Sequence, residues 1–334
     1  IYFNRLNLFY FLYFFEYSVI IQEKSIGGIT MELRVLNYFL AIAREQSIVH
    51  AAEALHLSQP TLSTQIKNLE EELGKQLFIR GTRGTRKVTL TEEGMILKKR
   101  AEEILDLVSR TEQEITMDDD IVVGDVYIGT GETDGVHLIA KAAHLLQNKY
   151  PGIHYHISSG NADFVFEQLE NGLIDFGLIL GSLDLTKYNA LELPYSDTWG
   201  VLMRRDSPLA HKEFITPEDL RSAPLILSQQ ESRGGTLTQW LGCPPEKLNI
   251  IATYNLIFNS SLFVNEGLGY AVILDKIINT SGNNSLCFRP LNPKLEIKLT
   301  LVWKKYQMFS KPAGKFLEVL KESLGLTGKR EEAI

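Results

Sequence analysis

The chain has 334 residues, a length typical of two or three domains. Its formal net charge is −7 and 44 % of its residues are hydrophobic, which excludes a uniformly basic protein that coats nucleic acid but leaves room for a local basic surface. The two cysteines, Cys243 and Cys287, show neither metal-site spacing nor a disulfide framework. We therefore expect a reducing, cytoplasmic setting, no metal site and no cofactor.

Residues 1–30 are unusually rich in Ile, Leu, Phe, Tyr and Asn. Their apolar run is interrupted by Asn7 and Glu16 and falls short of the roughly 20 apolar residues of a membrane-spanning helix. No small-residue cleavage site of a secretory signal follows it. AT-rich non-coding DNA yields these residue types on translation, and Gly27-Gly28 fits a ribosome-binding site upstream of Met31. We expect residues 1–30 to be untranslated upstream sequence.

Residues 32–74 predict three helices. The first, residues 32–44, is amphipathic, and residues 47–74 contain two more helices joined by a tight turn. Apolar residues stand at helical spacing in this pair: Ala51, Ala52, Leu55, Leu57, Leu62, Ile66 and Leu69. The last helix opens at Gln59, Pro60 and Thr61 and turns an outward polar face to solvent, formed by Gln59, Thr61, Ser63, Thr64 and Lys67. A helix of this kind suits the major groove of DNA.

Residues 77–90 predict a two-stranded wing whose turn contains Gly81 and Gly84. The segment 75–87 is a basic island without an acid, made of Lys75, Arg80, Arg83, Arg86 and Lys87. Three helices and a wing form a winged helix-turn-helix domain over residues 31–90, with the helix-turn-helix motif at about 48–67. For each arginine, a DNA contact and a plain surface charge are equally compatible with the sequence.

Thr91 is a good N-cap for a long helix over residues 91–118. Its apolar residues follow a 4-3-4-3-4 spacing, which indicates pairing with a second helix. The residues of this seam are Leu97, Ala101, Ile104, Val108, Thr111 and Ile115. Packing of the helix against its own domain is the alternative. Asp118, Asp119 and Asp120 are expected to form an acidic hinge.

From residue 121 strands and helices alternate, which predicts parallel sheets with helices on both faces. Strands are expected at 126–130, 154–158, 175–180, 199–203, 225–228, 270–273 and 298–303, and helices at 134–150, 162–170 and 311–324. Ligands of such folds bind where the ends of the strands meet the starts of the helices.

The loop 129–135 follows a strand and opens a helix. Its glycine spacing does not fit the dinucleotide-binding fingerprint. We interpret Thr130, Gly131, Glu132 and Thr133 as ligand contacts, with the two threonines as donors. Glu132 and Asp134 would repel a simple anion, and a helix-capping role is equally compatible with these two acids.

The strings AAEALHLSQPTLSTQIKNLEEELGKQLFIR and VTLTEEG resemble the amino-terminal domain of LysR-type transcriptional regulators. The strings SPLAHKEFITPEDLRSAPLIL and VNEGLGYAVIL look like the effector domain of that family. The resemblance implies a mixed fold, in which the winged helix-turn-helix and linker helix precede a two-lobed α/β effector domain at 121–325, similar to periplasmic binding proteins. Lobe I would comprise about 121–193 and 290–325, and lobe II about 194–289.

The resemblance also implies function. Such a protein binds dyad promoter sites on double-stranded DNA as a dimer or tetramer and responds to a small effector, and RNA polymerase is a further partner that this activity allows. Family correspondence adds cleft residues from both lobes, although a turn or cap explains each of them equally well: Ser159, Gly160, Asn161, Gly181, Ser228, Gln229 and Asn255. Many members of the family carry Arg where Thr64 stands. This chain therefore lacks one side chain that could donate two hydrogen bonds to a guanine base.

Two other classes fit less well. A solute-binding protein of a transport system, with residues 1–30 as membrane anchor, does not account for the helix-turn-helix. An enzyme is disfavoured because the sequence has no nucleophile triad, P-loop, HExxH or CxxC motif.

Overall fold

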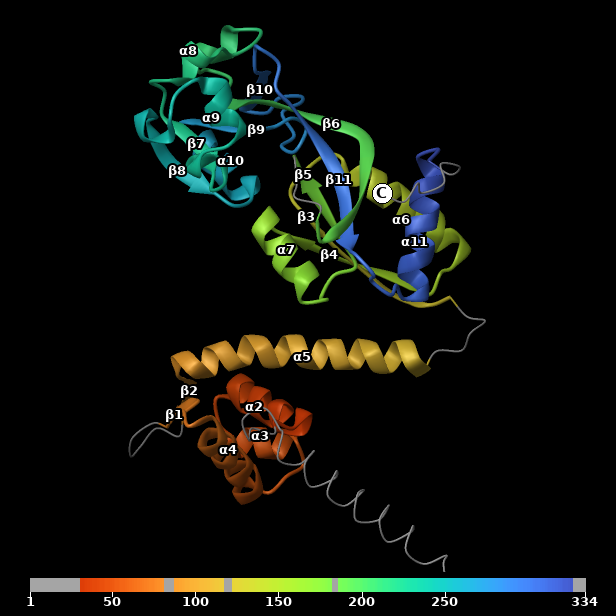
Figure 1. Ribbon diagram of the computed structural model, residues 1–334. Coiled ribbons are helices and arrows are strands. Elements are labelled where there is room, and N and C mark those ends of the chain that lie inside the picture. The colour runs from red at the N-terminus through yellow and green to blue at the C-terminus, as the bar shows by residue number, and fades with distance from the viewer. Residues whose placement is uncertain (1–30, 81–86, 117–121, 182–185, 327–334) are drawn as a thin grey trace, which may run out of the picture. The chain divides into compact units, whose positions relative to one another are not determined.

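The computed structural model describes residues 31–80, 87–116, 122–181 and 186–326, which form two compact units divided between Ile115 and Thr116 (Figure 1). Each unit is described by itself. The expectations for residues 1–30, Arg83, Arg86 and the acidic hinge at 118–120 concern positions outside the described residues.

The first unit is α-helical with a small hairpin. Its elements are α2 (Leu33–Glu45), α3 (Ile48–Ala54), α4 (Gln59–Leu73), β1 (Phe78–Arg80), β2 (Val88–Leu90) and α5 (Glu92–Thr116). Strands β1 and β2 pair antiparallel, with Phe78 opposite Leu90. The three predicted helices, the wing and the long helix are therefore confirmed.

Short polar side chains define where α3, α4 and α5 begin. The Ser47 and Ser58 side chains accept the backbone N–H groups of His50 and Thr61 at 3.3 Å, and Thr91 Oγ1 accepts that of Gly94 at 2.9 Å. Helix α4 ends at Gly74, whose left-handed φ of 62° closes the helix at little cost because glycine lacks a Cβ. Sequence and local structure agree at every one of these ends.

The second unit is a mixed α/β structure. Its elements are β3 (Gly124–Thr130), α6 (Val136–Lys149), β4 (Ile153–Ser159), α7 (Ala162–Glu170), β5 (Phe176–Leu180), β6 (Tyr188–Arg204), α8 (Pro217–Leu220), β7 (Leu225–Ser228), α9 (Thr236–Leu241), β8 (Ile250–Tyr254), α10 (Ile257–Asn265), β9 (Tyr270–Leu274), β10 (Leu286–Pro290), β11 (Glu296–Lys304) and α11 (Lys311–Ser323). The strands follow the order β4-β3-β5-β11-β6-β9-β7-β8, with β10 paired to β6.

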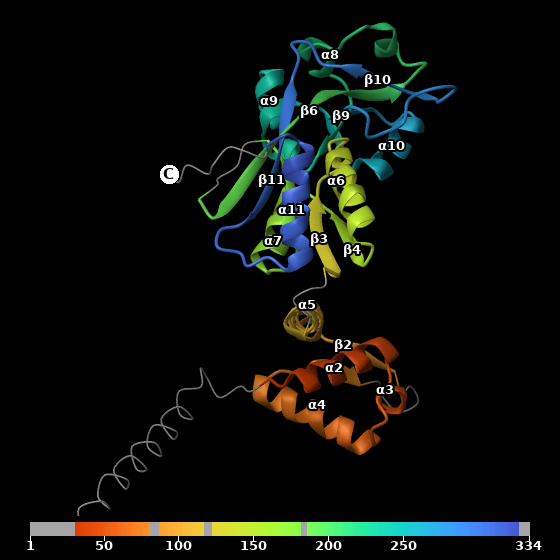
Figure 2. The same ribbon diagram turned by 90° about the vertical axis from the view of Figure 1, so that its right-hand side faces the viewer.

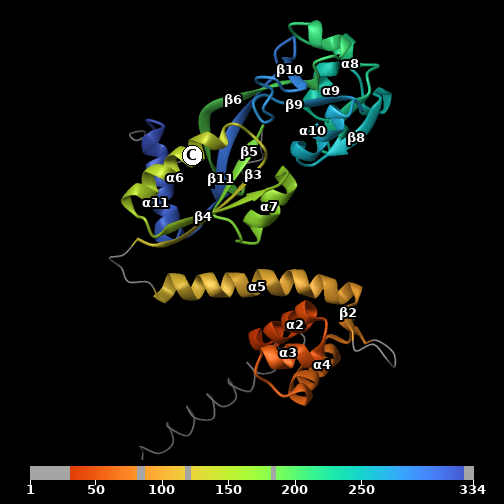
Figure 3. The same cartoon turned by 180° about the vertical axis from the view of Figure 1, so that it is seen from behind.

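Strand β6 divides this unit into two lobes. Its first part pairs with β11, and its last part pairs with β9 and β10 (Figure 1). Lobe I contains β3, β4, β5, α6, α7 and α11, and lobe II contains β7 to β10 with α8 to α10 (Figure 3). The fold is therefore the two-lobed α/β arrangement that was expected.

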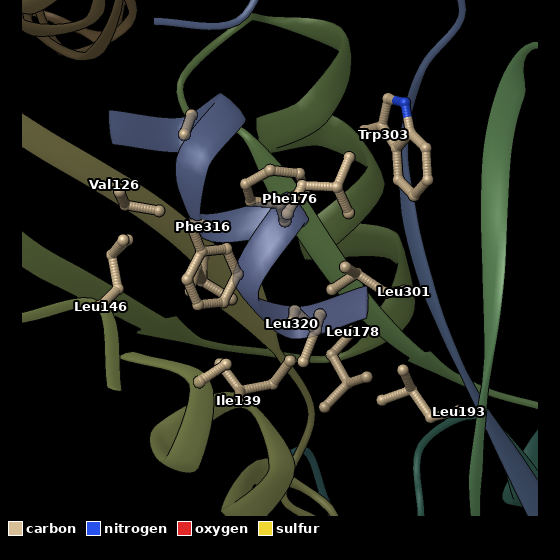
Figure 4. Packing of buried hydrophobic residues seen from close by; sticks show 14 of the residues in the cluster. Val126, Ile139, Leu146, Phe176, Leu178, Leu193, Leu301, Trp303, Phe316 and Leu320 are labelled. Carbon is tan, nitrogen blue, oxygen red and sulfur yellow. The ribbon is translucent and has the colours of Figure 1, made fainter. Parts of the chain in front are cut away.

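Lobe I has a core on each face of its sheet. Helices α6 and α11 cover one face, where Phe176, Leu301, Phe316 and Leu320 pack together (Figures 2 and 4). Helix α7 covers the other face through Val165 and Leu169. Lobe II has its own two clusters, around Val201 and Val272 and around Ile226 and Ala271.

The prediction of parallel sheets is wrong in part. Strand β3 pairs parallel with β4 and β5, and β7 pairs parallel with β8 and β9. However, β6, β10 and β11 run antiparallel to their neighbours. An apolar run indicates a strand buried on both faces but not its direction, which depends on the connections. Strands β8 and β10 and helices α8 to α10 were not predicted at all.

None of the helices described here combines the length and the apolar character needed to cross a lipid bilayer.

Candidate functional site

Helix α4 separates an apolar side from a polar side. Leu62, Ile66 and Leu69 are 0–2 % exposed and belong to the core of the first unit. The predicted outward residues lie on the other side, where Ser63 is half-buried and the rest are exposed: Gln59, Pro60, Thr61, Thr64 and Lys67. The core thus holds the helix while its polar side stays open to a partner.

The N-terminus of α4 offers fewer backbone donors than its position suggests. Ser58 Oγ accepts the N–H of Thr61, Ser58 O accepts that of Leu62, and Pro60 has none. Among the described residues, only the N–H of Gln59 in this first turn has no such acceptor. A phosphate clamp at this helix start would therefore rest on Gln59 and the exposed side chains.

Lys67 of α4 and Lys75, which follows that helix, are each paired with an acid. Lys67 Nζ lies 3.2 Å from Glu71 on the next turn, and Lys75 Nζ lies 3.3 Å from Glu93. Exposed pairs of this kind contribute little to stability, so a phosphate can replace the carboxylate as partner.

Glu70 fixes the wing to α4. One of its carboxylate oxygens accepts the backbone N–H groups of Leu77 at 2.8 Å and Phe78 at 3.2 Å, where β1 begins. Arg80 ends β1 opposite Val88. Glu70 is a positioning residue that sequence reasoning missed, because its bonds depend on how the chain turns after Gly74.

The predicted seam of α5 divides into two parts. Leu97 and Ala101 are 9 % and 0 % exposed and lie in the core of their own domain, so for these two the alternative of packing within the domain holds. Ile104 and Ile115 are 40 % and 78 % exposed, Thr111 is exposed and Val108 is half-buried. Only the later part of the seam is open to a partner helix.

A cavity of about 240 Å³ lies between the two lobes of the second unit. Seven of the predicted residues line it: Gly131, Glu132, Gly160, Asn161, Gly181, Ser228 and Asn255. The cavity is also lined by four residues that the sequence did not predict, Trp199, Gln230, Glu231 and Tyr254. These residues follow no local motif, because β6, β7 and β8 bring them together from distant parts of the chain.

The other four predicted residues do not line the cavity. Thr130 Oγ1 donates to the carbonyl oxygen of Gly131 at 2.8 Å. Thr133 Oγ1 donates to Asp197 and accepts the backbone N–H of Gly135 at 2.9 Å. Both threonines therefore shape the loop, and their assignment as ligand donors stays a prediction. Ser159 and Gln229 are exposed beside the cavity.

Polar lining residues hold local structure as well. Asn161 caps α7 by accepting the N–H of Phe164 at 3.0 Å, and Ser228 Oγ accepts the N–H of Glu231 at 3.2 Å. Asn255 Oδ1 accepts the N–H of Leu256 at 2.9 Å. These side chains are held in fixed orientations, so they offer a preformed wall to a ligand.

Glu132 connects the lobes. Its carboxylate accepts the backbone N–H of Ile257, the first residue of α10, so an acid from lobe I caps a helix of lobe II. The alternative interpretation, a cap on the helix that the loop itself opens, is wrong for Glu132: α6 has no side-chain cap, and the acid instead caps α10 in the other lobe.

A charged cluster surrounds the crossing of β6 between the lobes. Tyr195 donates to Asp134 at 2.6 Å, and Lys276 Nζ lies 3.0 Å from Tyr195 Oη and 3.7 Å from Asp134. Burial raises the pKa of Asp197 to about 6, and the nearby Asp275 adds to this shift. The cluster couples the loop 131–135 of lobe I to the residues after β9 in lobe II.

Two family models match the chain. Residues 33–95 match the model described as "Bacterial regulatory helix-turn-helix protein, lysR family". Residues 121–325 match "LysR substrate binding domain", which by itself covers more than half of the chain.

Individual relatives agree with these matches. The chain is 29 % identical over 303 residues to the Hca operon transcriptional activator HcaR of Escherichia coli (strain K12), covering 88 % of this chain and 98 % of that protein. It is 27 % identical over 298 residues to the uncharacterized HTH-type transcriptional regulator YvbU of Bacillus subtilis (strain 168), covering 88 % and 99 %. Full-length CbnR in complex with its target DNA has a similar fold, with a TM-score of 0.66 at 19 % identity over 88 % of this chain and 100 % of that one.

Proposed function

Because the chain belongs to the LysR family of bacterial transcriptional regulators, we propose that it binds dyad promoter sites in the cytoplasm as a homodimer or homotetramer and responds to a small effector in its inter-lobe cleft. The observation that carries the proposal is the exposed polar face of α4 on a well-packed helical core. The helix-turn-helix match weighs against the alternative of a solute-binding protein for transport.

Helix α4 would enter the major groove with its N-terminal half. Ser63 and Thr64 would contact base edges, while Gln59, Thr61 and Lys67 would contact phosphates. Arg80, Arg83 and Arg86 of the wing would add phosphate or minor-groove contacts. Sequence preference would then come from short polar side chains rather than from an arginine fork.

Two copies would pair through the later part of α5. Ile104, Leu107 and Ile115 are large apolar side chains that are 40 %, 43 % and 78 % exposed. Pairing would bury them and hold two DNA-binding domains at a fixed separation, which matches the two-fold symmetry of a dyad site.

Effector binding would act by shifting the balance between arrangements of the two lobes. The bond between Glu132 and Ile257 and the cluster around Asp134 and Lys276 join the lobes beside the cavity. A ligand that changes these contacts favours one arrangement and thereby changes how paired copies present their DNA-binding domains.

Lys67→Ala should weaken binding to specific and unrelated DNA alike, and should reduce the slope of log affinity against log salt by about one unit. The reason is the loss of one phosphate-neutralising charge. Gel-shift titrations at several salt concentrations on the DNA upstream of the gene measure both quantities. Lys305→Ala, at an exposed lysine of the second unit, is the matched control and should change neither. No retardation of the unmodified protein at low salt would contradict the regulator assignment.

Glu132→Ala should raise the exchange rate of the Ile257 amide hydrogen about tenfold, because that N–H loses its acceptor from the other lobe. Hydrogen-exchange mass spectrometry of peptides covering the start of α10 measures this. Glu246→Ala, at an exposed acid of lobe II away from the cavity, should leave the exchange unchanged. Unchanged protection in Glu132→Ala would show that the lobes are not joined through this carboxylate.

A further inference from the structure

The cavity between the lobes is lined by acids without any basic partner. Its charged lining residues are Glu132 from lobe I and Glu231 from lobe II, and the described lining includes no lysine, arginine or histidine. Burial, and after it the charges of both acids, raise the pKa of Tyr254, which lines the same cavity. An anion placed here would meet negative charge that no basic side chain of the described lining offsets.

Two of the helix starts at the cavity, those of α9 and α10, are already occupied by acids of the protein. Glu132 caps α10 at Ile257, and Glu231 accepts the N–H of Leu237 at 2.8 Å, at the start of α9. Helix starts attract anions because their N–H groups lack acceptors, and here the carboxylates of the protein itself take that place. A carboxylate ligand at either of these two starts would therefore have to displace one of them.

The remaining walls suit an organic cation. Trp199 and Tyr254 supply aromatic rings, and Leu180, Ile273 and Ile297 supply aliphatic surface. Aromatic faces attract cations, and aliphatic walls take the hydrocarbon body of a ligand. Trp199 is 6 % exposed and its Nε1 has no hydrogen-bond partner among the described residues, so an oxygen of a ligand would give this N–H its acceptor.

We infer, on the basis of the proposed effector role of this cleft, that the effector is a small organic cation: an amine protonated at neutral pH, with an apolar body. The ammonium group lies between Glu132 and Glu231, and the apolar body packs on the aliphatic wall. A hydroxyl or carbonyl oxygen on the same ligand accepts from Trp199 Nε1. The cavity of about 240 Å³ is smaller than the roughly 300–1,000 Å³ of common ligand pockets, which limits the ligand to a compact molecule.

Probes with the same number of carbon atoms and different charge test this inference. Benzylamine, benzyl alcohol and benzoate form one set, and butylamine, butanol and butyrate form a second. Isothermal titration calorimetry on the full chain should show each amine binding at least tenfold more tightly than its carboxylate. Glu231→Gln keeps an oxygen to accept from Leu237 but removes the charge, so it should weaken amine binding about tenfold, whereas Glu246→Gln should not. If Glu231→Gln does not fold, the comparison of probes on the unmodified protein still decides.

The outcomes separate this inference from the proposed function. Two results would show that the effector is not a cation: carboxylates that bind as tightly as the amines, or amine binding that Glu231→Gln leaves unchanged in a folded variant. Either result leaves the cleft as the effector site. Absence of binding by every probe overturns the inference and also counts against the cleft as a ligand site. DNA retardation, measured separately on the same preparation, reports on the regulator function whatever the probes do.

Discussion

Gly94→Ala is expected to lower affinity for the operator at least tenfold. A Cβ built at Gly94 would lie 2.2 Å from the carbonyl oxygen of Leu77, which is backbone and cannot rotate away. The clash forces α5 away from the residues that lead into β1. The position of the wing relative to α4 therefore changes, and the two can no longer contact DNA together. Alanine favours a helix over glycine by about 1 kcal/mol. Overpacking of about 1–3 kcal/mol opposes that gain.

Gel-shift titration of the full-length variant measures this loss. Met95→Ala is the matched control, because Met95 is the next residue of α5 and is 56 % exposed. It introduces the same residue into the same turn without the clash and should bind DNA like the unmodified protein. Equal affinity of Gly94→Ala and the unmodified protein would mean that the wing is not held by this contact.

The second unit should lose stability as the pH rises from about 4 to about 6, and Asp197→Asn should remove this dependence. The Asp197 side chain is fully buried, and burial raises its pKa from 3.8 to about 6. Asp134 and Asp275 add to the shift, while the hydrogen bond from Thr133 and the charge of Lys276 oppose it. An acid with a raised pKa in the folded chain favours folding while it is protonated, and this advantage disappears as the pH passes its folded pKa.

The expected size is about 3 kcal/mol in the free energy of unfolding, at about 1.4 kcal/mol per pKa unit. All three tryptophans, Trp199, Trp240 and Trp303, belong to the second unit, so urea unfolding followed by tryptophan fluorescence reports on it. The difference between the unmodified protein and Asp197→Asn should change across pH 4 to 6 and stay level above. The exposed Asp163→Asn serves as control. Parallel pH profiles of the unmodified protein and Asp197→Asn would contradict the buried, protonated state.

Most of the secondary structure of the first unit could be predicted from local sequence patterns. The spacing of Leu62, Ile66 and Leu69 defines the buried side of α4, and Ser58 and Gly74 define its ends, all within about four turns of chain. Because helical periodicity assigns both sides of a helix, the exposed polar face followed from the same residues. The contact of Glu70 with β1 did not follow, since it requires knowledge of the path after the helix.

The cleft was predictable only in part, for a physical reason. The loops that contain Gly131 and Asn161 lie at the ends of strands, where ligands of α/β folds usually bind. Trp199 and Tyr254 lie within strands and have no local signature of a ligand site. The bond from Ile257 to Glu132 joins residues 125 positions apart. Helix α10 mixes polar and apolar residues on its buried and exposed sides, so no amphipathic pattern predicts the helix.

The arrangement of β11 and α11 has a consequence for the order of folding during synthesis. Both elements come from the end of the described chain, yet Leu299, Leu301, Phe316 and Leu320 complete the core of lobe I. Most of the core of lobe II comes from one continuous stretch between β6 and β10, so it is complete on the ribosome earlier. Until β11 and α11 emerge from the ribosome, the apolar surface of β3 to β5 in lobe I stays uncovered. A ribosome that stops before Lys311 would therefore release a chain with a formed second lobe and an open first lobe, a natural substrate for chaperones and proteases.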